Sequence, residues 1–209
     1  MDTTSFEDLP YEVQEYVGQY LDQWDLRACV GVSRAWRTLF HSYLWRHVRI
    51  VWRSDMRQTN TPTELKTNCH LIHSLGLTCD SWHAPDFFAS CPPTFPFLTS
   101  LEFKGRFYGG NNEFEELIKR GGGLTAITGG WKKLVFCVKR EWEGMYEYGH
   151  SFFDTLIQHA APTVEVLRFE GPSDTNSTDI SRLLCSAPNL REFRIDGYLS
   201  GYDIVNSDW

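Results

Sequence analysis

The sequence lacks an apolar run of the roughly 18 residues that a membrane-spanning helix needs. It also lacks an excess of basic residues: its formal net charge is -7, whereas domains that bind nucleic-acid phosphate usually carry a net positive face. The first eight residues are polar and acidic, without the basic and apolar stretches of a secretory signal. We therefore expect neither a membrane nor nucleic acid as a partner, and a cytoplasmic or nuclear location.

Paired cysteines and low-complexity linkers are also missing. No Cys-x-x-Cys motif occurs, so we interpret the six cysteines as reduced thiols rather than a disulfide framework. Hydrophobic residues make up 42% of the chain and charged residues 22%, which is typical of a globular protein that buries a core. A chain of 209 residues is long enough for two modest domains or one elongated domain.

The first fifty residues predict three short amphipathic helices. Pro10 suits the first turn of a helix, Asp22 and Asp25 stand where a second would begin, and Ser33 is placed as the N-cap of a third. Three helices in about 40 residues cannot bury all of their apolar surface against one another, because so small a domain is marginal alone. Part of that surface should contact a partner.

The segment from Leu9 to Ile50 resembles the F-box family. Six landmarks of that family stand in register: Leu9-Pro10, Tyr20-Leu21, Asp25-Leu26, Val32-Ser33-Arg34, Trp36-Arg37 and Leu44-Trp45. The resemblance implies docking onto a Skp-type adaptor, which hangs from a cullin scaffold. The positions it assigns to the adaptor face, or to the small core of the helices, are Leu9, Pro10, Val13, Val17, Tyr20, Leu21, Leu26, Val32 and Trp36.

Two positions depart from the family pattern. Gln14 stands where a leucine is usual, and Gly18 stands where a large apolar residue is usual. Glycine inside a helix is less stable than alanine by roughly 0.5–1 kcal/mol, so these changes predict a weaker adaptor contact. The alternative interpretation of the whole segment is an ordinary helical cap on the following domain.

The remainder of the sequence contains an internal repeat. Residues 96–105, 162–171 and 188–197 align without a gap, with apolar residues in the order φ-x-x-φ-x-φ. The apolar positions are Leu98, Leu101 and Phe103; Val164, Leu167 and Phe169; and Leu190, Phe193 and Ile195. The same template fits Trp131, Leu134 and Phe136 and, less cleanly, Ile72, Leu75 and Leu77, and Trp45, Val48 and Ile50.

Helix signals lie between these motifs. They are a capping box at Thr61–Glu64, a segment capped by Asn111 and ending before Gly121, and the segments Ser151–Ala160 and Ser177–Ser186. Most motifs start 26 or 27 residues apart, within the roughly 20–29 residues typical of leucine-rich repeats. The pattern resembles the leucine-rich repeats that commonly follow an F-box, although the usual Asn or Cys after each strand is absent.

We therefore predict an α/β chain with two parts. Residues 1–46 form a three-helix F-box, and residues 47–209 form a leucine-rich-repeat-like solenoid, with a parallel sheet on its concave face and helices on its convex face. We expect the solenoid to be incomplete or uncapped at its C-terminus. The alternative is a compact α/β domain with alternating strands and helices.

Residues that alternate with the core positions of each strand should face outward. They carry charges of both signs, which favours a protein surface as the target. The residues predicted to bind the target protein are Glu102, Lys104, Lys133, Arg168 and Arg194. Val135 is predicted to face outward in the same way. A solvated face without a dedicated ligand is the alternative.

Catalytic and metal-binding patterns are weak. Cys69, His73, Cys79 and His83 are of the types that bind zinc, but no standard zinc spacing matches. The glycines at 121–123 and 129–130 lack the Gly-Lys-Ser/Thr ending of a phosphate loop. We expect no catalytic residue, metal or cofactor, and no enzymatic activity of the chain itself.

The predicted function is the substrate-recognition subunit of an SCF-type ubiquitin ligase. The chain would bind a Skp-type adaptor and, through it, a cullin, and would hold an unknown protein target near a charged ubiquitin-conjugating enzyme. Its contribution would be proximity rather than new chemistry. The alternatives are a scaffold that acts outside ubiquitination and a small α/β hydrolase or transferase.

Overall fold

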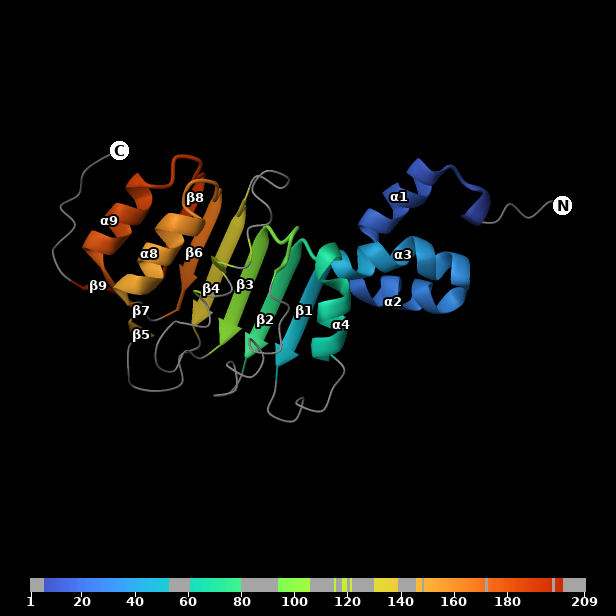
Figure 1. The fold of residues 1–209 in the computed structure, drawn as a ribbon, viewed down its shortest axis with the longest axis horizontal. Coiled ribbons are helices and arrows are strands. Elements are labelled where there is room, and N and C mark those ends of the chain that lie inside the picture. The colour runs from blue at the N-terminus through green and yellow to red at the C-terminus, as the bar shows by residue number, and fades with distance from the viewer. Residues whose placement is uncertain are drawn as a thin grey trace. The chain divides into compact units, whose positions relative to one another are not determined.

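The computed structural model describes residues 6–52, 61–79, 94–105, 115, 118–119, 121, 130–138, 146–147, 149–171, 173–196 and 198–200. The chain forms two compact units, which divide between Val48 and Arg49. The first unit is helical, and the second contains a sheet covered by helices (Figure 1). In these ranges no helix has both the length and the apolar character to cross a bilayer.

The first unit contains the three predicted helices, α1 (Tyr11–Tyr20), α2 (Gln23–Val32) and α3 (Arg34–Arg46), after a short 3-10 helix η1 (Phe6–Asp8). The Asp22 carboxylate accepts hydrogen bonds from the backbone N–H groups of Trp24 and Asp25, both at 2.8 Å, and so begins α2. Ser33 Oγ accepts from the N–H of Trp36 at 3.1 Å, which confirms its predicted role as N-cap of α3.

Aromatic rings form the centre of this unit. Phe40 is fully buried, and its ring centroid lies 5.7 Å from that of Phe6 and 5.5 Å from that of Trp36. Tyr43 lies one turn further along α3, with its centroid 6.5 Å from that of Phe40. Leu26 of α2 is also buried. A core this small leaves other apolar residues of the helices outside it.

The second unit is built on a six-stranded sheet whose strands follow one another in sequence order. The strands are β1 (His47–Trp52), β2 (Ser74–Cys79), β3 (Ser100–Gly105), β4 (Lys133–Val138), β6 (Val166–Glu170) and β8 (Glu192–Ile195). Every pairing from β2 to β8 is parallel. The prediction of N-terminal helices followed by a parallel sheet is therefore confirmed.

The repeat alignment also gives the register of this sheet. The second apolar positions of the motifs are direct partners across the strands, namely Leu75, Leu101, Leu134, Leu167 and Phe193. The third positions form the next row, namely Leu77, Phe103, Phe136, Phe169 and Ile195. From β2 to β6 both rows are buried, whereas Phe193 and Ile195 on β8 are half-buried.

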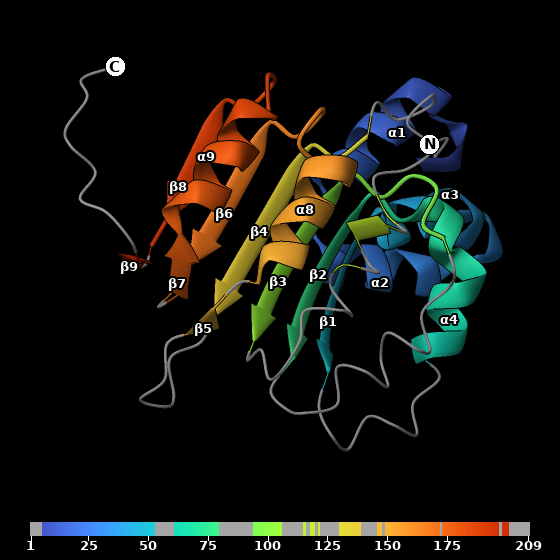
Figure 2. The same cartoon turned by 60° about the vertical axis from the view of Figure 1, so that its left-hand side comes forward.

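Helices cover the apolar side of this sheet. They are α4 (Thr61–Asn68), continued by the 3-10 helix η3 (Cys69–Leu71), and α8 (His150–His159) and α9 (Ser177–Cys185), which lie side by side in Figures 1 and 2. Phe152 of α8 packs edge-on against Phe136 of β4, with centroids 5.2 Å apart, and Phe153 packs against Phe169 of β6 at 6.0 Å. Helices α8 and α9 match the predicted ranges, Ser151–Ala160 and Ser177–Ser186, to within one residue at each end.

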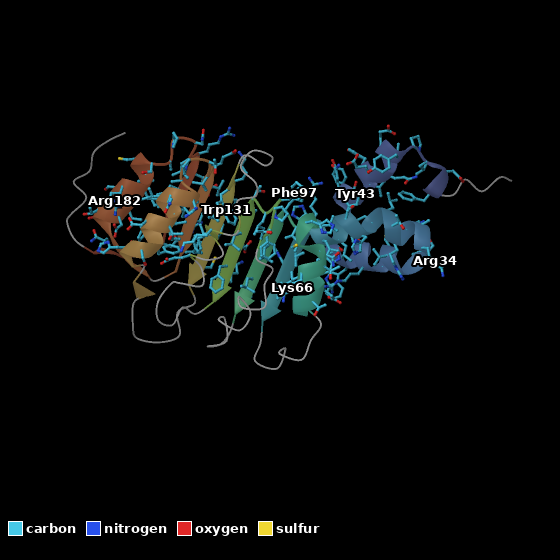
Figure 3. The ribbon with its side chains drawn as sticks, in the orientation of Figure 1. Arg34, Tyr43, Lys66, Phe97, Trp131 and Arg182 are labelled. Atoms are coloured by element: carbon cyan, nitrogen blue, oxygen red, sulfur yellow. The ribbon has the colours of Figure 1, made fainter. Side chains whose placement is uncertain are left out.

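Trp131 anchors the turn before β4. Its indole, labelled in Figure 3, is fully buried, and Nε1 donates a hydrogen bond to the carbonyl of Ile118 at 3.1 Å. Glu115, Ile118 and Lys119 are helical, in the range where the sequence predicts a helix. Most of that helix, including the predicted cap Asn111, lies outside the described residues, as does the side chain of Thr61 in the predicted capping box.

A second, three-stranded parallel sheet was not predicted. It consists of β5 (Tyr146–Glu147), β7 (Ser173–Asn176) and β9 (Tyr198–Ser200), in that order. These strands follow β4, β6 and β8 in the chain, so each of the last three motifs contributes one strand to each sheet. The short polar β7 has no hydrophobic alternation by which a strand could be recognised in the sequence.

Candidate protein-interaction surfaces

Helix α1 turns an apolar stripe away from the rest of the first unit. Gly18 faces α3, because a Cβ built on it would lie 3.1 Å from the ring of Tyr43, labelled in Figure 3. Residues two positions apart on an α-helix point in nearly opposite directions, so Tyr16 and Tyr20 face away from α3. Their side chains are 60% and 73% exposed. Together with the exposed Val13, one turn before Tyr16, they form what we call the aromatic stripe.

The two tyrosines of the stripe contact each other. Their ring centroids are 4.8 Å apart, and a hydrogen bond with Tyr16 raises the pKa of Tyr20. The rings therefore form a preformed pair on the surface rather than two independent side chains. Aromatic residues of this kind are enriched at protein–protein interfaces.

Helix α2 has a similar outward side. Leu26 points into the core, and Trp24, two positions earlier, points outward and is 76% exposed. The guanidinium of Arg27 lies 5.5 Å from the centre of the Trp24 ring, in cation–π geometry. Val32, at the end of α2, is exposed as well.

The structure divides the nine residues that the resemblance assigns to the adaptor face or the core. Leu26 is buried, and the half-buried Trp36 packs against Phe40, so these two belong to the core. The residues that remain exposed are Pro10, Val13, Tyr20 and Val32, and the half-buried ones are Leu9, Val17 and Leu21.

Three exposed aromatic residues of this unit were not among the predicted positions, namely Tyr11, Tyr16 and Trp24. Tyr16 could have been found from helical spacing, because it stands three residues after Val13 and four before Tyr20. Trp24 gives no such signal, since its orientation is known only once Leu26 is placed in the core.

The two departures from the family pattern are explained by local contacts. The side-chain amide of Gln14 donates a hydrogen bond to the carbonyl of Leu9 at 2.7 Å, which ties α1 to the turn before it. Gly18 allows close approach to Tyr43. Neither residue belongs to the aromatic stripe, and both make contacts inside the first unit instead.

In the second unit, the sheet face opposite the apolar rows carries the predicted target-binding residues. Arg168 of β6 is the direct register partner of Arg194 of β8. Glu102 and Lys104 of β3 and Lys133 of β4 alternate with the core positions of their strands and so lie on the same face. Val135 stands between Glu102 and Arg168 and is only 4% exposed. Val135 therefore lies on the predicted outward face of the sheet, but it is buried there rather than exposed to solvent.

Ion pairs organise this face. Lys104 lies 2.7 Å from Glu102, Arg168 Nε lies 2.6 Å from Glu192, and Arg194 makes two hydrogen bonds of 3.0 Å to Asp196. The hydrogen bond from Lys104 lowers the pKa of Glu102, and that from Arg168 lowers the pKa of Glu192. The five predicted residues thus lie on one surface, which we call the polar sheet face, and four of them hold partners there.

Cys137 shares this face but is an inert thiol. Its Sγ donates a hydrogen bond to Glu170 Oε2 at 2.9 Å. Burial and this carboxylate raise the pKa of Cys137 to about 12, so the thiolate is scarce at neutral pH.

The weak zinc pattern is not assembled in the described part of the chain. Cys69 Sγ donates to the carbonyl of Lys66 at 3.3 Å, and the His73 ring stacks on Phe97 with centroids 5.7 Å apart. The side chain of Cys79 and all of His83 lie outside the described residues. Among the residues described, no group of three or more His, Cys, Asp or Glu side chains is arranged to hold a metal ion.

Comparison with known protein families gives a match in the first unit. Residues 6–51 match the F-box-like family. This part of the chain is an F-box-like domain, the kind of domain that generally binds Skp-type adaptors. The match covers α1, α2 and α3 and all of β1 except Trp52, and so includes the aromatic stripe, Trp24 and all six landmarks. No curated protein matches the chain significantly.

Proposed function

We propose that the chain is a substrate-recognition subunit of an SCF-type ubiquitin ligase. The observation that carries the proposal is an apolar stripe turned outward within an F-box-like domain. Exposed aromatic and aliphatic side chains on one side of a helix favour a protein partner, because burying them removes apolar surface from water. A Skp-type adaptor is the partner of such domains, and a cullin would be reached through it.

We propose further that the second unit is a leucine-rich-repeat-like solenoid. Three observations support it: each strand pairs with the next one along the chain, the motif positions stand in register, and the helices between strands lie on one side. In such a fold the free face of the sheet is the concave binding surface.

The target would bind the polar sheet face, with Arg168 and Arg194 as its main contacts. Arginine is enriched at interface hot spots. Both arginines are held by carboxylates, which fixes their guanidinium groups before the target arrives. A surface that carries paired charges of both signs fits a protein target that exchanges ion pairs with it, rather than a simple anion.

The chain would contribute proximity and no reaction centre of its own. A target lysine held near a charged ubiquitin-conjugating enzyme reacts at a high effective concentration. The proposal includes no cofactor, metal, nucleic acid or membrane partner, and it places the protein in the cytoplasm or nucleus, where ubiquitin ligases of this type act.

Co-purification with tagged protein tests the proposal. We expect the wild-type chain to retain a Skp-type adaptor and a cullin, and the double variant Leu9→Ala/Pro10→Ala to lose both. Leu184→Ala, which shortens an exposed leucine of α9, is the matched control and should retain both. Circular dichroism of each variant checks that the helices remain folded.

Each outcome separates the candidate functions. Retention of the adaptor without a cullin favours a scaffold outside ubiquitination, and retention of neither partner favours a small α/β enzyme. Full adaptor binding by the double variant would show that the F-box-like helices are not the docking site.

A further inference from the structure

We propose that Trp24, with Arg27 against its ring, is an anchor of the adaptor interface. The inference rests on the proposed function and adds a residue that none of the family landmarks contains. It assigns Trp24 to an apolar pocket on the adaptor and Arg27 to a carboxylate at the rim of that pocket.

The outward side of α2 is shaped to receive a partner. Trp24 points away from the core because it stands two positions before the buried Leu26. Ala28 and Gly31, one and two turns further along the same side, are exposed and small. A Cβ built on Gly31 would meet no atom within 4 Å. A large ring followed by small residues allows a partner to enclose the ring and approach the helix backbone closely.

Trp24 lies within the area that an adaptor docked on the aromatic stripe would cover. Trp24 stands four positions after Tyr20, so their Cα atoms are at most about 14 Å apart even along an extended chain. A standard interface covers about 800 Å² on each partner, a patch roughly 30 Å across. Val32, a landmark residue, is exposed eight residues after Trp24 on the same helix. Trp24 therefore lies in sequence between two exposed landmark residues, Tyr20 and Val32.

The contact with Arg27 prepares Trp24 for binding. The guanidinium stacks 5.5 Å from the ring centre, which restricts the ring before a partner arrives and brings a positive charge beside it. Trp and Arg are the residue types most enriched among interface hot spots. A partner pocket that accepts both needs an apolar floor and an acidic rim.

This anchor also offsets the departures at Gln14 and Gly18. Those two residues serve contacts inside the first unit, with Leu9 and Tyr43. An exposed tryptophan on α2 supplies apolar area at a position outside the family pattern. The chain therefore reaches its partner with a different distribution of aromatic residues along α1 and α2.

Titration calorimetry with a purified Skp-type adaptor tests the inference on the full chain. We expect Trp24→Ala to raise the Kd at least tenfold, Trp24→Phe to raise it less, and Arg27→Gln to raise it a few-fold and to weaken its salt dependence. Leu184→Ala should leave the Kd unchanged. Trp24 is largely exposed, so the thermal midpoint of Trp24→Ala should stay close to that of the wild type.

A photo-crosslinking residue provides a second measurement. Benzoylphenylalanine in place of Trp24 should crosslink to the adaptor, whereas the same residue in place of Leu184 should not. If the wild type binds the adaptor and Trp24→Ala binds equally well, the anchor is wrong while the proposed function stands. If the wild type does not bind, both fall together.

Discussion

Gly18 of α1 lies directly against the ring of Tyr43 of α3: a Cβ on this glycine would stand 3.1 Å from both Cδ2 and Cε2 of the tyrosine. The helix is therefore held close to α3 at a point where a longer side chain would push it away. This contact sets the direction of the aromatic stripe, because Tyr16 and Tyr20 stand two positions on either side of Gly18.

Replacement of Gly18 should separate steric effects from helix propensity. Gly18→Ala gains helix propensity but needs a small shift of the half-buried Tyr43 ring, so we expect a change within about 0.5 kcal/mol. Gly18→Leu should destabilise the chain by about 1–3 kcal/mol through overpacking. Urea unfolding of both variants, alone and combined with Tyr43→Ala, measures the energetic coupling between position 18 and the Tyr43 ring. Equal losses with and without the Tyr43 ring would refute the steric explanation.

The aromatic stripe should contribute to adaptor binding more than to stability. We expect Tyr16→Ala/Tyr20→Ala to weaken adaptor binding at least tenfold, because both rings lie on the free side of α1, and to change the thermal midpoint little. Tyr11→Ala is the control, because this exposed tyrosine lies two turns before Gly18, on the side toward Tyr43. Calorimetry with purified adaptor measures the Kd of the wild type and of both variants. If Tyr11→Ala raises the Kd more than Tyr16→Ala/Tyr20→Ala does, the interface lies on the opposite side of α1 from the aromatic stripe.

Acid should weaken the polar sheet face. The pKa values of Glu102 and Glu192 are lowered in the folded chain by hydrogen bonds from Lys104 and Arg168. Such groups stabilise the fold above their unfolded pKa of about 4.3, and this contribution is lost as the pH falls through their folded pKa. We expect the urea midpoint of Glu102→Gln/Glu192→Gln to fall less steeply from pH 5 to pH 3 than that of the wild type. Glu12→Gln, at an exposed glutamate of α1, serves as control, and parallel curves for all three would contradict the expectation.

Glu115 should stabilise the second unit through α8. Its buried carboxylate accepts hydrogen bonds from Ser151 Oγ at 2.7 Å, in the first turn of that helix, and from Thr155 Oγ1 at 3.4 Å, one turn further along. Glu115→Ala should lower the free energy of unfolding by about 1–3 kcal/mol, since the buried Thr155 hydroxyl loses its acceptor. Gln158→Ala, at an exposed position of α8, should change it by less than about 0.5 kcal/mol. Denaturant titration measures both, and similar values for the two would rule out this role.

Cys137 should resist alkylation. Its pKa of about 12 leaves almost no thiolate at pH 8, whereas Cys185 is exposed on α9. Brief treatment of the native chain with iodoacetamide, followed by peptide mass spectrometry, should label Cys185 and spare Cys137. Glu170→Gln removes the carboxylate that helps to raise the pKa of Cys137 and should increase its labelling. Rapid labelling of Cys137 in the wild type would contradict the hydrogen bond.

The strands could be predicted because their signal repeats. Leu101, Leu134 and Leu167 recur at the same motif position, and they stand beside one another in the sheet. The three F-box-like helices were predictable for a related reason, since Asp22 and Ser33 cap helices through local hydrogen bonds that involve only near neighbours in sequence.

What the sequence could not provide depends on contacts between distant residues. Val135 alternates with core positions and stands in register with Glu102 and Arg168, yet it is buried. Glu115 is buried against α8, and its partners Ser151 and Thr155 stand 36 and 40 residues away in sequence. Whether Leu26 belongs to the core or to the docking face was undetermined until the packing around Phe40 and the exposure of Trp24 were known.

The sequential order of the large sheet bears on how the chain is made. Each strand from β2 onward hydrogen-bonds to the one that precedes it in the sheet and in synthesis. A chain that emerges from the ribosome can add β4 to an edge formed by β3, and later β6 to β4, without waiting for a distant partner. A translational pause after β4 would leave an ordered edge that is ready for the next strand.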